Sequence, residues 1–310
     1  MGCVRCGKEP VIELQQGPLC SEHFVRYFEK KFYRTIRKYK LFSKQDRLCV
    51  ACSGGKDSLT VLDLVGKLAK KRRQPIFALG IDEGVPGYRE KQLEDLKYFC
   101  DRNNIEYKIV TFREEFGYTI EELMKIVEKK KLQISRCALC GILRRRLLNQ
   151  YAKRLGATKI IVGHNLDDEV QTFMMNLFKG GIELAARMGP ATGALKHDGF
   201  IPRVKPLYFC TEHETTAYTK LKGIRVIYAS CPYRKHSYRA FIAKHIDEIE
   251  KDYIGTKTSI IGNLMKMLPL LKKHYSSGKI PECRLCGEPG RNDVCTACAT
   301  LKKLGVKGPD

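Results

Sequence analysis

The stretch from residue 49 to residue 58, CVACSGGKDS, places two glycines, a lysine and two serines at the end of an apolar run. Glycines let backbone N–H groups approach an anion, and a helix that begins here directs the positive end of its dipole at the same point. The Walker pattern G-x-x-x-x-G-K-[ST] is not met. An ordinary strand-to-helix turn is the alternative, but we predict a shorter anion-binding loop with Lys56 as a counter-charge, formed by Ser53, Gly54, Gly55, Lys56, Asp57 and Ser58.

A second polar motif, GHNLDDE, begins at Gly163 and follows another short apolar run. Carboxylates at the start of a helix often do no more than stabilise its dipole. Because this pair would lie beside a phosphate loop, we expect it to position Mg²⁺ or the reacting groups. Asp167 is the catalytic candidate and Asp168 a ligand-binding candidate, whereas we assign no role to His164.

Cysteines at both ends of the chain have the spacing of structural zinc sites. A Cys-x2-Cys or Cys-x2-His knuckle lets two ligands face one tetrahedral ion, and two knuckles complete a closed site that stabilises a short segment. Scattered buried or reactive cysteines are the alternative. We predict one zinc ion at each end, bound by Cys3, Cys6, Cys20 and His23 and by Cys283, Cys286, Cys295 and Cys298.

A third set of cysteines has only three members. Cys137 and Cys140 lie in ISRCALCG, and the distant cysteine best placed to join them is Cys231, which follows the apolar run RVIYAS. Three thiolates complete neither an all-cysteine zinc site nor a fully ligated iron–sulfur cluster. Spacing alone leaves three interpretations: an iron–sulfur cluster with one open position, a redox-active pair with Cys231 incidental, and a zinc site completed by a histidine.

Apolar runs that alternate with amphipathic helical patterns must position these motifs. From residue 47 onward the pattern predicts strands at 47–52, 75–81, 105–112 and 158–163, separated by helices. One of these helices, 141–156, is expected to begin just after Cys137 and Cys140. This order is typical of an α/β protein that has a parallel sheet with helices on both faces. Because the carboxyl ends of such strands share one edge, SGGKDS, IDEGVPGY and GHNLDD are expected to form one composite site.

The flanking regions suggest further elements. We predict a helix at 22–42, a loop or flap at 179–205, a strand at 225–230 and a linker helix at 256–273 that continues through Pro269. The expected units are an N-terminal zinc finger, a catalytic domain with the three-cysteine site, and a linker helix with a zinc ribbon, at 1–28, 29–255 and 256–310.

The charge of the chain favours a polyanionic partner. It has 57 basic and 34 acidic residues, a net charge of +23 with histidine neutral. Any single basic run is explained equally well as a solvated helix face. No apolar stretch approaches the ~20 residues of a membrane-spanning helix, and the N-terminal MGCVRC has no apolar signal core. We expect a cytoplasmic protein that does not contact a membrane.

The strand–SGGKDS–helix arrangement resembles the PP-loop of the ATP pyrophosphatases, which bind a pyrophosphate and transfer AMP to a substrate oxygen. With the terminal zinc motifs, CALCG, GHNLDDE and SCPYR, nearly the whole chain is similar to the tRNA 2-thiouridine synthetases of the TtuA and cytosolic wobble-thiolation group. That resemblance implies a [4Fe-4S] cluster with one open iron on Cys137, Cys140 and Cys231. It also implies that ATP with Mg²⁺ contacts backbone groups of Ala51 and Ile81, together with Arg144 and Gly163.

The resemblance further implies that a uridine C2 oxygen of tRNA is adenylated and then exchanged for sulfur delivered through the cluster. IDEGVPGYRE and CALCGILRRR are closer to the wobble-uridine subgroup, since the thermophilic T-loop subgroup usually has a His-containing strand end where this chain has Leu79-Gly80-Ile81. Thiolation of a T-loop uridine or a cytidine, lysidine formation, and a non-catalytic zinc-bearing RNA-binding protein are the alternatives. The sulfur donor, free sulfide or a ubiquitin-like carrier, and a homodimer stay open.

Overall fold

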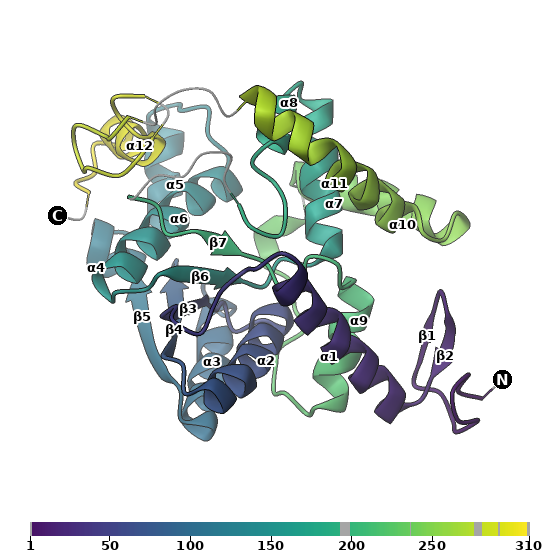
Figure 1. Cartoon of the computed structure of the whole chain (residues 1–310). Coiled ribbons are helices and arrows are strands. Elements are labelled where there is room, and N and C mark those ends of the chain that lie inside the picture. The colour runs from purple at the N-terminus through teal and green to yellow at the C-terminus, as the bar shows by residue number, and fades with distance from the viewer. Residues whose placement is uncertain (1, 193–198, 236, 276–280, 291, 309–310) are drawn as a thin grey trace.

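The computed structural model describes residues 2–192, 199–235, 237–275, 281–290 and 292–308. Within these residues the main sheet has the strand order β5-β4-β3-β6-β7, and every neighbouring pair is parallel (Figure 1). The predicted α/β fold with a parallel sheet is confirmed. The strands are β3 Leu48–Ala51, β4 Ile76–Asp82, β5 Glu106–Thr111, β6 Lys159–Val162 and β7 Arg203–Val204.

The central strand β3 is apolar at consecutive positions rather than at alternate ones. Leu48, Cys49 and Val50 have no exposed surface, because both faces of the strand are covered by helices. From β3 the chain moves outward to β4 and β5, and then returns to form β6 on the other side of β3. SGGKDS follows β3 and GHNLDD follows β6, so both motifs lie at the point where the strand order reverses, the usual ligand crevice of such sheets.

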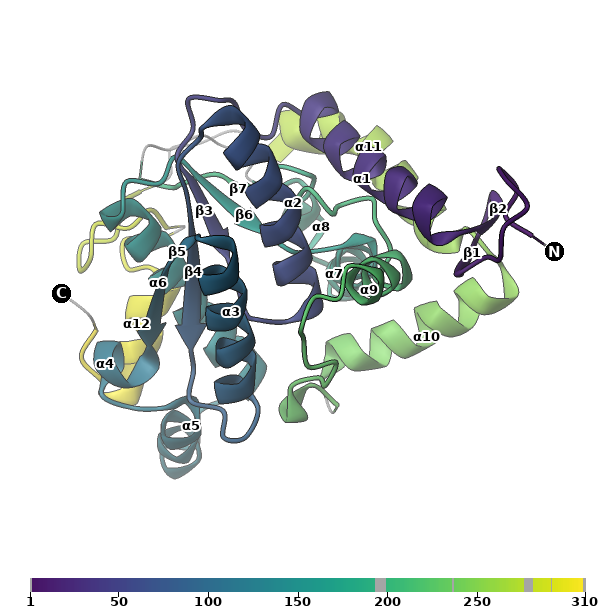
Figure 2. The same ribbon diagram turned by 90° about the horizontal axis from the view of Figure 1, so that it is seen from below.

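Helices cover both faces of the sheet (Figure 2). On one face, the core includes Leu62 and Tyr218 of the helices that pack there. On the other face it includes Leu123 and Leu143. The first group is α1 Ser21–Lys38, α2 Lys56–Arg72, α3 Arg89–Asn103 and α9 Glu212–Leu221, and the second is α4 Phe112–Phe116, α5 Ile120–Lys129, α6 Arg136–Arg154 and α12 Thr296–Leu304.

A further group of helices packs together on the side of α7, around Val170, Ile246 and Leu264. The helices are α7 Leu166–Phe178, α8 Ile182–Ala185, α10 Tyr238–Asp252 and α11 Thr256–Tyr275. Helix α11 continues through Pro269, as the sequence predicts. None of the described helices is long and apolar enough to cross a membrane.

The two ends of the chain lie on opposite sides of the molecule (Figure 1). At the N-terminus, the antiparallel pair β1 Ile12–Leu14 and β2 Gly17–Leu19 leads into α1. Helix α1 runs without a break through residue 28, so the predicted domain border there falls inside a helix. Thr256, the first residue of α11, coincides with the other predicted border. The division into three units stays a prediction.

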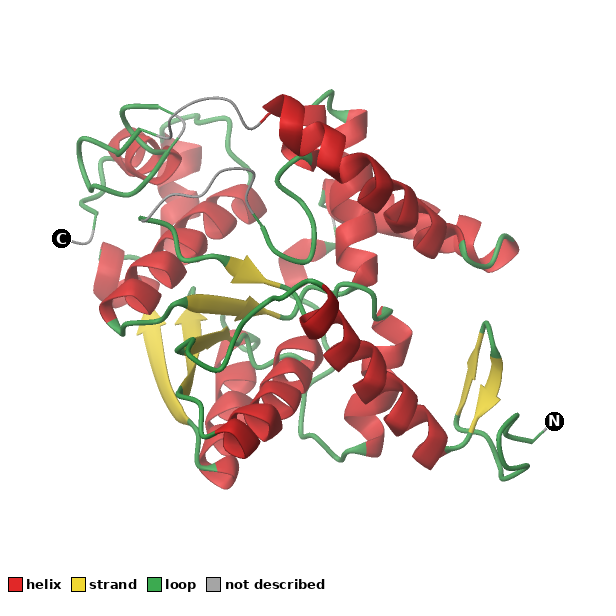
Figure 3. Cartoon of the chain, viewed as in Figure 1, coloured by secondary structure: helices red, strands yellow, loops and turns green. Residues whose placement is uncertain are grey.

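Three predictions about secondary structure are wrong. Residues 225–230 form no strand; they lie against the α2–α3 side of the core, where Arg225 pairs with Asp95 at 2.8 Å. The edge strand β7 and helix α8 come instead from the predicted loop or flap. Helix α6 begins before the cysteines rather than after them, because the Ser135 hydroxyl accepts a hydrogen bond from the Ala138 N–H and caps the helix. Figure 3 shows these elements by type.

Candidate active site

Among the described residues, the loop after β3 leaves backbone N–H groups without intramolecular partners at the start of α2. Gly54 has a φ of 82°, and a Cβ atom there would lie 1.8 Å from the carbonyl oxygen of Gln92 in α3, so only glycine fits. Gly55 is the N-cap of α2, and it has no side chain to cap the helix. The first N–H groups of α2 therefore stay available for an anion.

Serine hydroxyls hold the shape of this loop. The Ser53 N–H donates to the Ser58 Oγ at 3.2 Å, and the two hydroxyl oxygens lie 3.3 Å apart. Ser58 in turn donates to the Gly55 carbonyl at 2.9 Å. The loop is thus already folded back on itself, so binding a phosphate there needs little ordering of the chain.

Lys56 is a cation at the mouth of the loop. Its Nζ lies 2.8 Å from Asp57 Oδ2 and 3.0 Å from Glu212 Oε1 in α9. Burial lowers the pKa of Lys56, but the charges of these two carboxylates outweigh burial and leave the pKa raised. A phosphate that enters the loop would meet a charged ammonium group already fixed in place.

The end of β6 touches the phosphate loop. A Cβ atom on Gly163 would lie 3.0 Å from backbone atoms of Asp57 and Ser58, so a larger residue would push the two segments apart. Asn165 caps α7 and donates from Nδ2 to Asp57 Oδ1 at 3.1 Å. The structure therefore brings the SGGKDS and GHNLDD motifs together, as the sequence predicts.

Two carboxylates approach each other at this junction. Burial raises the pKa of Asp57 and of Asp168, and the negative charge of Asp168 raises that of Asp57 further. Carboxylates that repel each other beside a phosphate loop are suited to Mg²⁺, which takes one or two carboxylates together with substrate phosphates. Both oxygens of Asp57 already have partners, Oδ2 in Lys56 at 2.8 Å and Oδ1 in Asn165 at 3.1 Å, so Asp168 is the better candidate ligand.

Asp167 has a different environment from its neighbour. Its side chain is 8% exposed, with Oδ1 2.5 Å from Lys257 Nζ in α11 and Oδ2 accepting from the Glu212 N–H at 2.7 Å. Both oxygens are engaged in joining α7 to α9 and α11. The geometry favours Asp168 over Asp167 as the carboxylate that acts at the phosphate loop.

The remaining predicted ATP contacts surround the same edge. Ala51 ends β3, and Ile81 lies in β4 with a buried side chain, so only its backbone is available to a ligand. Arg144 projects from α6 with 43% of its side chain exposed.

A buried carboxylate that we did not single out from the sequence, Glu83, joins the phosphate loop to the central cysteines. Its Oε2 lies 2.5 Å from Arg89 Nε, and Arg89 also donates to the Ser53 carbonyl at 3.0 Å. Its Oε1 lies 3.2 Å from Arg144 Nη1 and 3.9 Å from the Cys140 sulfur. One carboxylate with no exposed surface is thus shared by two arginines and a thiol.

The only sequence signal for this bridge is that Glu83 and Arg89 both occur in IDEGVPGYRE. The chain turns back between them through Gly84 and Gly87, whose φ angles are 72° and 67°. Such a return brings residues six apart into contact. It is not visible from helix or strand periodicity.

The three central cysteines meet at the beginning of α6. The short helix η1, Pro232–Arg234, follows Cys231 and packs against α6, and the Tyr233 carbonyl oxygen lies 3.9 Å from the Cys137 sulfur. Burial, and then the charge of Glu83, raise the pKa of the Cys140 thiol to about 12, and Cys231 is close enough to contribute. A thiolate at this position therefore needs a metal to stabilise it.

These three sulfurs are spaced too widely to bind a single tetrahedral ion together. All are free thiols, yet they are not gathered within 4.8 Å of one another as the ligand atoms of each terminal set are. A cubane cluster separates its cysteine ligands more widely than one tetrahedral ion does, and the chain supplies three of the four thiolates that a [4Fe-4S] cluster takes when fully ligated.

The terminal sets have the geometry of a single tetrahedral ion. The Cys6 and Cys20 sulfurs lie 3.7 Å apart and the Cys286 and Cys295 sulfurs 3.8 Å apart, whereas zinc–sulfur bonds of about 2.3 Å at tetrahedral angles predict roughly 3.8 Å. The Cys295 N–H donates to the Cys283 sulfur at 3.2 Å. The predicted ligands of each end are all brought together: Cys3, Cys6, Cys20 and His23, and Cys283, Cys286, Cys295 and Cys298.

His164 lies near several positively charged side chains. Part of its side chain is exposed, but the ring is surrounded by protein atoms that exclude water from it. This desolvation, together with the charges of Lys205, Arg239 and Arg144, lowers the pKa of His164 to about 3. The imidazole is therefore neutral at pH 7.

Comparison with known proteins gives consistent relatives. The model of the PP-loop domain matches residues 25–248. The tRNA-5-methyluridine(54) 2-sulfurtransferase of Pyrococcus horikoshii is 35% identical over 301 residues, which cover 96% of this chain and 93% of that protein. The tRNA 2-thiolation protein NcsA of Haloferax volcanii is 31% identical, with 98% and 99% covered.

A solved structure resembles the whole chain. The U34-tRNA thiolase NcsA from Methanococcus maripaludis, with its [4Fe-4S] cluster, superposes with a TM-score of 0.84 at 28% identity, covering 100% of this chain and 98% of that one. Cytoplasmic tRNA 2-thiolation protein 1 of Caenorhabditis elegans is 31% identical over 94% of this chain and 77% of its own length.

Proposed function

The chain belongs to the PP-loop tRNA 2-sulfurtransferases, and from that premise we propose that it adenylates a uridine C2 oxygen and then replaces that oxygen by sulfur. The observation that carries the proposal is the bridge through Glu83, which joins the phosphate loop to the three cysteines. This contact holds the phosphate loop and the cysteines close enough for both to act on one atom of the substrate.

In the first step the uridine C2 oxygen attacks the α-phosphorus of ATP, pyrophosphate leaves, and the N3 proton is released. Ser53, Gly54, Gly55 and Ser58 hold the leaving pyrophosphate through backbone N–H groups and hydroxyls, and Lys56 neutralises its charge. Asp168 would hold Mg²⁺, which would neutralise charge on the phosphates. Asp167 positions α7 through Lys257.

In the second step sulfur, at the oxidation level of hydrosulfide, attacks C2, AMP leaves with the former C2 oxygen, and the sulfhydryl proton returns to N3. Cys137, Cys140 and Cys231 would hold a [4Fe-4S] cluster, which would offer an open iron to the sulfur atom. Arg144, fixed by Glu83, faces the departing phosphate and stabilises its charge.

We propose that the substrate is the wobble uridine of tRNA. The names of two relatives differ here: the Methanococcus maripaludis structure is a U34-tRNA thiolase, and the Pyrococcus horikoshii relative acts on 5-methyluridine 54. IDEGVPGYRE and the strand end Leu79-Gly80-Ile81 support the wobble position. The T-loop uridine is the second candidate, because the Pyrococcus horikoshii relative has the higher identity of these two.

We also propose bound metals, a cellular location and partners for this protein. Each terminal set binds structural zinc, and the protein acts in the cytoplasm, the compartment in the name of the Caenorhabditis elegans relative. Phe241 and Ile249 expose apolar side chains on α10, and Tyr253, directly after the helix, is also exposed; these groups favour a homodimer. Free sulfide or a carrier protein supplies the sulfur.

The test is an anaerobic reaction of cluster-loaded protein with tRNA, ATP and sulfide, followed by measurement of AMP and mass analysis of the nucleosides. We expect 2-thiouridine at the wobble position with one AMP for each sulfur. Lys56→Ala should abolish AMP formation and leave tRNA binding unchanged, because phosphate contacts with RNA are spread over many residues. Lys67→Ala, on the same helix, is the matched control. AMP formation by the Lys56 variant would refute the proposed role of the loop.

A further inference from the structure

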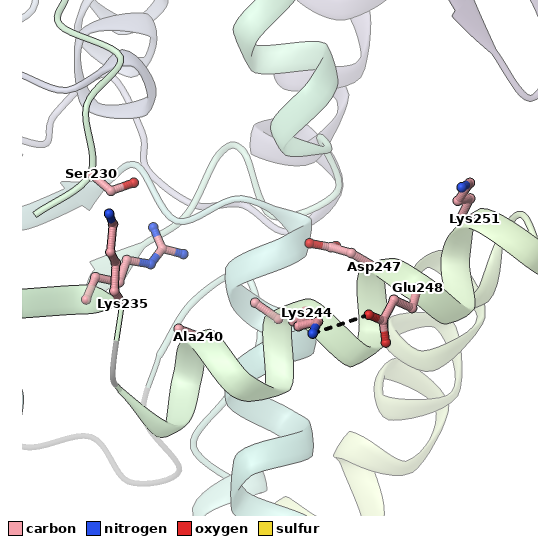
Figure 4. Close-up of a pocket in the computed structure, with 9 residues that line it drawn as sticks. Ser230, Lys235, Ala240, Lys244, Asp247, Glu248 and Lys251 are labelled. Atoms are coloured by element: carbon pink, nitrogen blue, oxygen red, sulfur yellow. Dashed lines mark ion pairs between the residues drawn. The ribbon is translucent and has the colours of Figure 1, made fainter. Parts of the chain in front are cut away.

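A groove of about 640 Å³ runs beside α10, on the side of the three-cysteine site. Ser230, the residue before Cys231, and Lys235 line one end of it, and Lys251 lies toward the other end (Figure 4). Ala240 and Ala243 form part of its floor. Because α10 rises 1.5 Å per residue, the stretch from Ala240 to Lys251 is roughly 16 Å long, enough for more than one phosphate of a nucleic-acid strand.

The charges of the groove are unbalanced in favour of cations. Of its two carboxylates, Glu248 pairs with Lys244 at 3.9 Å, and Asp247 shares Lys257 with Asp167, each at 2.5 Å. By contrast, no carboxylate of the described residues lies within ion-pair distance of three cations that line the groove: Arg234, Lys235 and Lys251. Three cations without counter-ions, over a floor of small residues, suit a chain of phosphates.

The groove is held in a fixed position relative to the candidate active site. Arg239, near the start of α10, donates to the Asp168 carbonyl at 3.2 Å and to Thr172 Oγ1 at 3.0 Å, so α10 is anchored to α7. Lys257 links Asp247 in the groove to Asp167. A strand bound along α10 would therefore reach the cysteines at a defined distance from the phosphate loop.

We propose that this groove binds the phosphodiester backbone of the RNA strand next to the target uridine and directs that nucleotide toward Cys231. The proposal rests on the proposed function for the identity of the substrate, but the groove itself follows from its charge and position. A protein partner is the competing occupant. RNA is favoured because the unpaired groups are cations, and the chain as a whole has a charge of +23.

The experiment measures the dissociation constant of full-length, cluster-loaded protein with tRNA at several salt concentrations. For Lys235→Gln with Lys251→Gln we expect severalfold weaker binding at each salt concentration and a logarithmic salt slope that is smaller by roughly one to two, the change expected for two lost phosphate contacts. Ala243→Glu, which adds a negative charge to the floor, should weaken binding in the same direction. ATP affinity should stay constant, because none of these residues contacts the phosphate loop.

The matched control is Lys70→Gln with Lys71→Gln at the far end of α2, which removes the same charge elsewhere and should leave the salt slope less affected. Equal slopes for groove and control variants overturn the proposal, as does a groove variant that loses self-association or protein binding while its tRNA affinity is unchanged. A different result would refute the proposed function: wild-type protein would bind tRNA but would not thiolate it.

Discussion

The cysteine sites at the ends of the chain and the site in its middle are built in opposite ways. Each terminal set draws its ligands from one stretch of at most 21 residues, and the ligand atoms lie within 4.8 Å of one another. The central set joins the first turn of α6 to Cys231, which is 91 residues beyond Cys140. It is more open, and Glu83 connects it to the phosphate loop.

The terminal sets are suited to stabilising the fold, whereas the central set is suited to taking part in a reaction. A closed four-ligand site satisfies its metal and gives it no free position, so it holds a small segment together. A three-thiolate site leaves one position for a substrate atom, but the fold must hold its ligands, because they are far apart in the chain. Variants at the two kinds of site should therefore fail in different ways.

The largest effect is expected at the central site. Cys231→Ala should lose its iron and reduce thiolation below detection, while zinc content stays the same, because no other thiol of the central set can replace the third ligand. Iron, zinc and 2-thiouridine are measured on the same preparation. Cys100→Ala, a buried cysteine in the core, is the control and should keep both metals and activity. Full thiolation by the Cys231 variant would remove the three-cysteine site from the mechanism.

The next effect tests the link between the central site and the phosphate loop. Glu83→Gln leaves Arg89 buried without a counter-charge, and Arg89 holds the Ser53 carbonyl, so ATP affinity should fall by about tenfold, equivalent to ~1.4 kcal/mol. Isothermal titration of cluster-free protein measures this without any contribution from catalysis.

The control for Glu83 is Glu214→Gln, which breaks a similarly buried pair with Lys31 far from the cysteines. It should lower stability, as removal of one partner of a buried pair does, but leave ATP affinity unchanged. An equal loss of ATP affinity in both variants would mean that Glu83 matters only for folding.

A smaller effect is expected at the ends. Cys286→Ser should remove about one zinc ion per chain and lower the melting temperature by several degrees, since α12 packs on α6 through Leu301 and Leu304. Iron content and the rate of thiolation should change little. If iron were lost together with zinc, the terminal and central sites would not be independent.

The smallest effect concerns pH. In the folded protein burial and nearby cations hold the pKa of His164 at about 3, below its ordinary value of about 6.5. As pH falls, the unfolded chain therefore protonates His164 before the folded protein does. The contribution of neutral His164 to the free energy of unfolding is complete above pH ~6.5 and is lost toward pH ~3. His164→Gln should show a smaller decrease of the urea midpoint between pH 7 and pH 5. The partial exposure of the side chain keeps this difference small.

Much of the fold was predictable because its signals are local. Apolar runs such as Leu48–Ala51 predict strands whose ends share one edge, and the SGGKDS motif needs glycine at position 54 for its φ of 82°. The strand predicted at 225–230 was wrong because a short apolar run also suits an extended segment that lies on the outside of the core. The start of α6 was misplaced because the cap at Ser135 precedes the apolar pattern.

The sequence by itself determined the ligands of the terminal sites, the phosphate loop and the parallel order of the fold, since each depends on spacing over a few residues. Only the tertiary structure decided that Glu83 lies between two arginines and Cys140, that Asp167 is occupied by Lys257, and that Lys235 and Lys251 line one groove. The physical reason is that a charged side chain is placed by its partners, and these partners come from helices and loops that only the folded sheet brings together.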